Sequence, residues 1–159
     1  MKTPTNTTTT MPPLRDETIE ALQDLISINI DSCEGLRTAS DTIDDASIAG
    51  TLRTLAAERE GFARDLQAHV RGNHTKPEED GSVRGTLHRW WLSLRGTLQG
   101  GDAHAVLAEA ERGEDAIKAC YEKVLKDIPG SPLQKVLMTQ YSRVKAGHDK
   151  VRDLRDSTK

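Results

Sequence analysis

Four long stretches of the chain carry apolar residues at steps of three and four, the period of an α-helix with one buried face. They run over about 15–42, 46–71, 102–126 and 131–156. The alternating runs of β-branched residues that indicate strands are absent. The pattern therefore predicts an all-α chain built on four long helices.

Residues typical of helix ends separate these stretches. Asp45 and Asp102 stand where an N-cap is expected, and Gly72-Asn73 is suited to a left-handed stop. Pro129-Gly130 breaks the third stretch, and Ser131-Pro132 is an N-cap and first-turn signal for the fourth. The first and second helices, and the third and fourth, are thus joined by short turns.

The connection between the second and third stretches is about 30 residues, which is long enough to cross the domain. Within it, about 82–98 repeats apolar residues at helical spacing and predicts an extra short helix that contains Trp90 and Trp91. One long crossover is the ferritin-like variant of an antiparallel four-helix bundle. We therefore expect a disordered polar tail over 1–13 and one bundle domain over 14–159.

Composition excludes several classes of function. The net charge of −3 argues against a general nucleic-acid binder, and no apolar stretch approaches the roughly 20 residues of a membrane span. The N-terminus lacks the apolar core of a secretory signal, and the two cysteines, Cys33 and Cys120, lack metal-type spacing. We expect a cytoplasmic protein with two buried, reduced thiols, a redox pair being the alternative.

Four polar residues interrupt the apolar rows at positions expected to face inward. Each lies three, four or seven residues from apolar members of its own row. Counted from the two tight turns, the two polar residues of each hairpin come within about 3 Å of one level. The sequence therefore predicts that four side chains converge inside the bundle, namely Glu34, Glu58, Glu114 and His148.

Buried carboxylates require compensation, because an unpaired charge is costly away from water. A metal ion, internal salt bridges, a raised pKa or incomplete burial would each supply it. Lys145 and Arg59 are the nearby cations in sequence, and Glu111, one turn before Glu114, is a further acid. If a metal binds, its oxygen and imidazole ligands suit iron, manganese or zinc.

At these positions the chain resembles ferritin-like proteins of the rubrerythrin and bacterioferritin type, which hold two irons with glutamates and Glu-x-x-His segments on four helices. Glu34 and Glu114 match the single glutamates, Glu58 the Glu of one segment and His148 the His of the other. The chain departs from the pattern at Gly61, in place of His, and at Lys145, in place of Glu.

From about residue 14 onward the chain more closely resembles a bacterial family of uncharacterised ferritin-like bundles. The shared stretches are 33–39, 87–91, 111–115 and 148–154. This resemblance implies the fold and carries no established activity.

Three hypotheses follow. The first is a non-catalytic or weakly metal-binding bundle, a homodimer with a stress-related or interaction role, in which Lys145 neutralises the glutamates. The second is an iron- or manganese-dependent oxidase or peroxidase that uses the Glu/His cluster. The third is an adaptor that binds a protein or nucleic acid through the Trp90-Trp91 helix.

Overall fold

The computed structural model describes residues 13–81 and 102–158. These residues form four helices and no strand: α1 (Asp16–Thr42), α2 (Ala46–Gly72), α4 (Ala103–Asp127) and α5 (Gln134–Ser157). The prediction of an all-α chain is confirmed. The predicted short helix with Trp90 and Trp91, and residues 1–12 of the predicted tail, lie outside the described residues. No described helix has the length and apolar character needed to cross a membrane.

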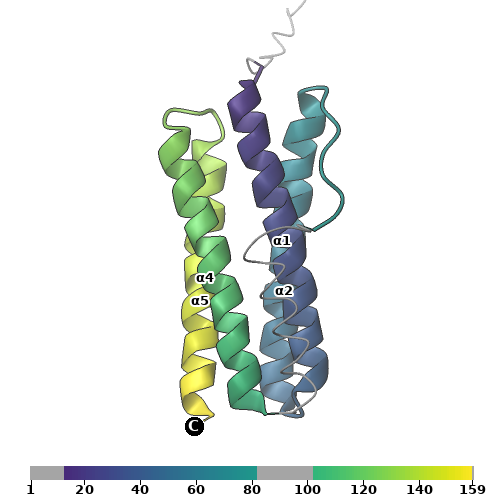
Figure 1. The fold of residues 1–159 in the computed structure, drawn as a ribbon, viewed down its shortest axis with the longest axis vertical. Coiled ribbons are helices and arrows are strands. Elements are labelled where there is room, and N and C mark those ends of the chain that lie inside the picture. The colour runs from purple at the N-terminus through teal and green to yellow at the C-terminus, as the bar shows by residue number, and fades with distance from the viewer. Residues whose placement is uncertain (1–12, 82–101, 159) are drawn as a thin grey trace, which may run out of the picture.

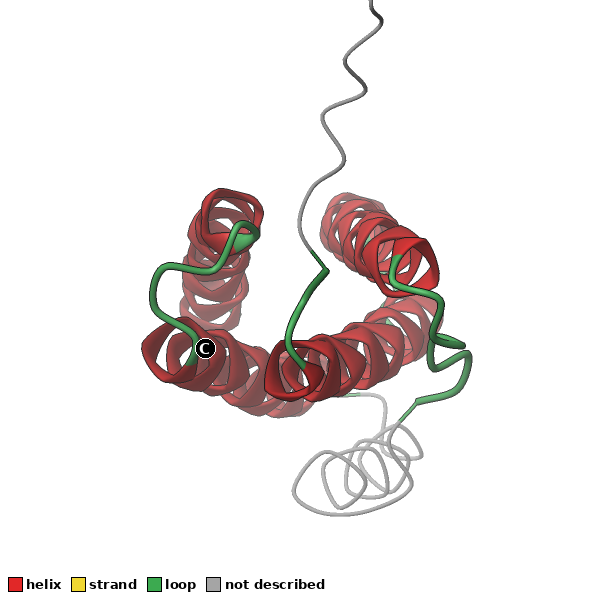
Figure 2. Cartoon of the chain, turned by 90° about the horizontal axis from the view of Figure 1, so that it is seen from above, coloured by secondary structure: helices red, strands yellow, loops and turns green. Residues whose placement is uncertain are grey.

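The helices stand side by side along the long axis of the molecule (Figure 1). α1 and α2 run in opposite directions and pack closely on each other, as do α4 and α5, and α1 also packs on α4. Seen from above, the four helices follow a horseshoe with α2 and α5 at its two ends (Figure 2). Of the helix pairs in contact, α2 and α5 touch least.

The helix ends follow the predicted caps at two places and depart from them at two others. Asp45 accepts a hydrogen bond from the Ile48 amide at 3.0 Å, and Asp102 caps α4. α5, however, begins at Gln134 rather than at Ser131-Pro132, because residues 130–133 form a turn first. The left-handed residue after α2 is His74, with φ 60°, and not Gly72 or Asn73.

The core is built on rows of buried residues that alternate steps of three and four along each helix. This is the spacing of helices whose side chains interdigitate along one seam. Most members are apolar, but each row also holds a polar residue or a glycine. In α2, α4 and α5 the rows are Leu52, Ala56, Arg59, Ala63, Leu66 and Val70; Leu107, Ala110, Glu114, Ile117, Tyr121 and Val124; and Leu137, Gln140, Val144, Gly147 and Val151.

Candidate functional site

A buried ion pair lies in the middle of the helical core. Arg59 of α2 donates from Nη2 to Oε2 of Glu114 of α4 at 2.5 Å. The two side chains are 0% and 1% exposed. Along α2, the fully buried Leu52 and Leu66 stand seven residues to either side of Arg59. The charged pair therefore replaces an apolar layer of the core.

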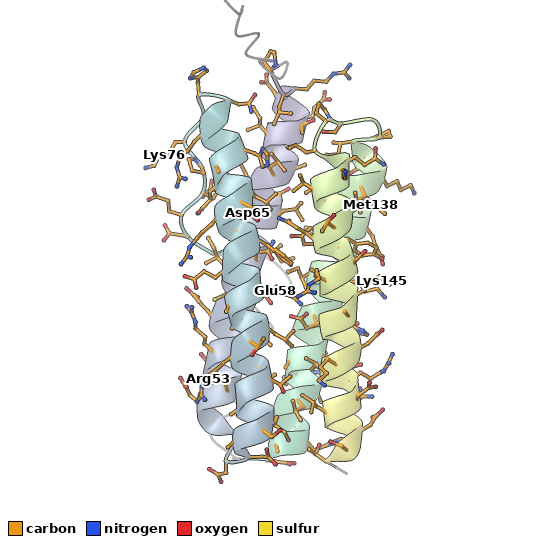
Figure 3. The ribbon with its side chains drawn as sticks, turned by 180° about the vertical axis from the view of Figure 1, so that it is seen from behind. Arg53, Glu58, Asp65, Lys76, Met138 and Lys145 are labelled. Carbon is orange, nitrogen blue, oxygen red and sulfur yellow. The ribbon has the colours of Figure 1, made fainter. Side chains whose placement is uncertain are left out.

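This pair extends into a hydrogen-bonded network that joins all four helices. Ser32 of α1 donates to Oε1 of Glu114 at 3.0 Å, so both carboxylate oxygens are engaged. Arg59 Nη1 also donates to Glu58 at 2.9 Å. Arg143 of α5 closes the network by donating from Nε to Glu58, again at 2.9 Å. Glu58 and α5 lie at the surface seen in Figure 3. Two cations and two anions balance within this network.

Burial and neighbouring charges shift the pKa of Arg59 in opposite directions. Desolvation is the largest single effect and lowers the pKa of the guanidinium, but the charge and hydrogen bond of Glu114, together with Glu58 and Tyr121, outweigh it, so the pKa stands above its ordinary value. Arg59 therefore stays charged at every working pH. A fully buried cation held this way makes its partner indispensable, because either charge left alone would be desolvated without compensation.

A second polar layer lies next to the first. The Tyr121 hydroxyl of α4 accepts from Asn29 of α1 and donates to Gln140 of α5, each at 2.8 Å. Burial raises the pKa of Tyr121, although the Asn29 hydrogen bond and the Arg59 charge oppose this. The phenol is thus a neutral hydrogen-bonding hub between three helices.

Gly147 of α5 makes room for the ion pair. A Cβ atom at this position would stand 2.5 Å from Nη2 of Arg59 and 3.2 Å from Cδ2 of Leu55. The guanidinium therefore occupies the space beside the α5 backbone that any larger residue would fill. Gly147 was not singled out from the sequence, although it lies three residues after Val144 and four before Val151.

The structure brings together only part of the predicted four-residue cluster. Glu114 is buried, and Glu58 and His148 are half-buried near the edge. Glu34 is exposed on α1, so the prediction that it faces inward is wrong. A helix turns by about 100° per residue, and the residues on either side of Glu34, Cys33 and Gly35, are the ones that are buried. Glu58 and His148 likewise stand one residue away from the buried rows of their helices, next to Arg59 and Gly147.

The compensating cation also differs from the prediction. Lys145 is exposed, and its Nζ lies 5.8 Å from the centre of the Tyr141 ring rather than beside the glutamates. Arg59, named from sequence only as a neighbouring cation, neutralises Glu114 instead. Of the four forms of compensation considered, an internal salt bridge is the one observed at Glu114.

His148 and Glu111 take part in separate surface contacts between α4 and α5. His148 Nε2 lies 2.6 Å from Asp115 and 4.0 Å from Glu111. Glu111 also pairs with Arg155. The prediction that His148 meets Glu114 at one centre is therefore replaced by two clusters, one inside the helical core and one near its surface.

The donors that the resemblance assigns to a metal do not fit one in this arrangement. In residues 13–81 and 102–158, no group of three or more His, Cys, Asp or Glu side chains is placed to hold a metal ion. The carboxylates of Glu58 and Glu114 are both bonded to the Arg59 guanidinium. A cation placed between them would have to displace a charge that is already there.

Both cysteines are free thiols, with Cys33 buried and Cys120 half-buried. Burial raises the pKa of Cys120 from 9.0 to about 11, and Asp24 adds to the effect. We predict that folded Cys120 is alkylated at pH 8 roughly 100-fold more slowly than an ordinary thiol, since only the thiolate reacts. Its contribution to stability is complete below pH 9 and is lost as the pH rises to about 11. Iodoacetamide rates in folded and urea-unfolded protein measure this, and equal rates would contradict it.

Taken together, the four helices and the Arg59–Glu114 network define an all-helical protein with a charged pair in its core. The chain belongs to the family described as Domain of unknown function (DUF2383), whose profile matches residues 17–127. The matched residues include Ser32, Glu58, Arg59 and Glu114, and they end with α4. No curated protein matches the chain.

Proposed function

We propose that this chain is a ferritin-like antiparallel four-helix bundle with a degenerate metal site, and that it acts as a non-catalytic structural or interaction protein. Three features support the fold class: the opposite directions within each hairpin, the long connection between α2 and α4, and the position of Glu114 inside the bundle.

The observation that carries the proposal is the Arg59–Glu114 contact at 2.5 Å. In the ferritin-like proteins that the sequence resembles, glutamates from several helices neutralise metal cations at the bundle centre. Here a guanidinium from α2 supplies the positive charge, while Ser32 and Glu58 complete its surroundings. A covalently attached cation holds the helices together permanently and offers no open coordination position for chemistry.

Elemental analysis of protein expressed with added iron and manganese tests the proposal. We expect the wild type to hold far less than one metal ion per chain. The Glu58→Ala, His148→Ala double variant is the comparison, because the competing hypothesis assigns both residues to the metal. Near-stoichiometric metal in the wild type that disappears in this variant would favour an iron- or manganese-dependent enzyme instead.

A variant that lacks the Arg59 charge tests the same proposal more directly. Arg59→Ala leaves the Glu114 and Glu58 carboxylates without their shared cation, so added Mn²⁺ should raise its melting temperature more than that of the wild type. Arg59→Ala, Glu114→Ala is the matched control and should lose this gain. An Arg59→Ala protein that is folded by circular dichroism but indifferent to Mn²⁺ would show that the guanidinium does not occupy a cation position.

The homodimer, the cytoplasmic location and the Trp90-Trp91 adaptor surface remain predictions from the sequence. Among large hydrophobic side chains of the described residues, only Met138 is exposed, at 46%. Light scattering on the full-length chain decides the oligomeric state.

A further inference from the structure

α5 is the least embedded of the four helices. It buries five residues, whereas α1 buries twelve and α2 and α4 bury eight each. Two of those five are Gln140 and Gly147, so the fully buried apolar side chains of α5 are Leu137, Val144 and Val151, while Tyr141 and Leu154 pack on the core only partly buried. Burial of apolar surface is the main force that docks a helix, and α5 has the smallest share of it.

Polar contacts make up much of what holds α5 to its neighbours. Toward α4, Gln140 accepts from Tyr121, and three pairs lie nearer the surface: Tyr141 with Glu122, His148 with Asp115, and Arg155 with Glu111. Toward α2, Arg143 pairs with Glu58 and Gly147 abuts Arg59. The Arg143 side chain is 66% exposed. Exposed ion pairs of this kind contribute little and are weakened by salt.

α5 lies where its removal would uncover the buried ion pair. α5 stands at one end of the horseshoe, where it packs along α4 and touches α2 only lightly (Figures 2 and 3). Its Gly147 backbone lies directly beside the Arg59 guanidinium, which also contacts Glu58 of its own helix and Glu114 of α4. Removal of α5 alone would leave the α1–α2 and α1–α4 contacts intact and would expose the ion pair to water.

We propose that α5 is a detachable cover over the Arg59–Glu114 pair, which undocks from folded α1, α2 and α4 as one cooperative unit. Sub-global openings of this kind occur where a segment has few apolar contacts and many solvent-exposed polar ones. The turn at 128–133, with Gly130 at φ 74°, joins α5 to α4 and is the hinge about which the cover moves. Docking of α5 controls access to the buried network whether or not that network replaces a metal.

Hydrogen exchange on the full-length protein tests the cover. We expect amides in the centre of α5, from Gln140 to Val151, to exchange roughly tenfold or more faster than amides in the buried rows of α1, α2 and α4. Raising the salt concentration to about 1 M should widen this difference, because salt screens the ion pairs that join α5 to α2 and α4. One common exchange rate for all four helices would overturn the proposal, as would fast exchange confined to the last turn of α5.

Two α5 variants separate undocking from general loss of stability. Arg143→Ala removes the ion pair with Glu58 and should accelerate exchange across the centre of α5 while the other helices keep their wild-type rates. Lys150→Ala, which removes another exposed cation from the same helix, is the matched control and should leave the pattern unchanged. Equal acceleration of all four helices by Arg143→Ala would show that the bundle opens only as a whole.

Discussion

Replacement of Arg59 by methionine is expected to lower the free energy of unfolding by about 3–5 kcal/mol, the usual cost of breaking a buried ion pair on one side. The methionine is of similar length and helix propensity, so the loss comes mainly from Glu114, whose side chain is 1% exposed in the wild type and would lose its cation. Urea unfolding followed by far-ultraviolet circular dichroism measures the change. A surface control, Arg37→Met, removes the exposed Arg37–Glu60 pair and should cost no more than about 1 kcal/mol.

A double variant distinguishes charge from packing as the cause. In Arg59→Met, Glu114→Leu both charges are gone, so we expect it to be more stable than either single replacement, Arg59→Met or Glu114→Leu. Ser32 then loses its acceptor, but a serine hydroxyl can turn to a carbonyl of its own helix. Additive losses from the two single changes would mean that the two residues contribute independently. In that case the ion pair would not be the element that stabilises the centre of the helical core.

The helices could be predicted from sequence because their signals are local. The apolar period fixes which stretches are helical, and the side chains of Asp45 and Asp102 cap neighbouring amides within three residues. The start of α5 was misplaced for a comparable local reason. Ser131-Pro132 suits the first turn of a helix, but the Gln134 amide donates to the Ser131 carbonyl three residues back, so a tight turn precedes α5.

The candidate site could be predicted only in part, because it depends on which of two adjacent residues faces the core. Glu114 was placed correctly, since it falls in an unbroken row from Leu107 to Tyr121. On α2 the row passes through Arg59, so Glu58 points to the edge while the arginine lies inside. Arginine is rarely fully buried, and only tertiary structure shows that Glu114 of another helix compensates it. Gly147 has no side chain, so the sequence does not indicate its role, which depends on the residues that pack against it.

Two glycine substitutions are expected to have opposite effects on stability. Gly147→Ala should destabilise the protein by about 1–3 kcal/mol, because the new Cβ would stand 2.5 Å from Arg59 Nη2 and 3.2 Å from Leu55. The end of an arginine side chain could normally move aside, but this one is fixed by its bond to Glu114. Gly61→Ala is the matched change on α2, and nothing lies within 4 Å of its Cβ. It should stabilise the helix by up to about 1 kcal/mol.

Repeating both glycine substitutions in an Arg59→Ala protein tests whether the guanidinium causes this difference in stability. In an Arg59→Ala protein the space beside Gly147 is vacated, so adding Gly147→Ala should cost much less than in the wild type. Adding Gly61→Ala should have the same small effect in both backgrounds, since its Cβ meets no neighbouring atom. Thermal and urea unfolding of the six proteins supply the comparison. A Gly147→Ala loss that persists unchanged without Arg59 would assign the clash to Leu55 and would remove Gly147 from the ion-pair site.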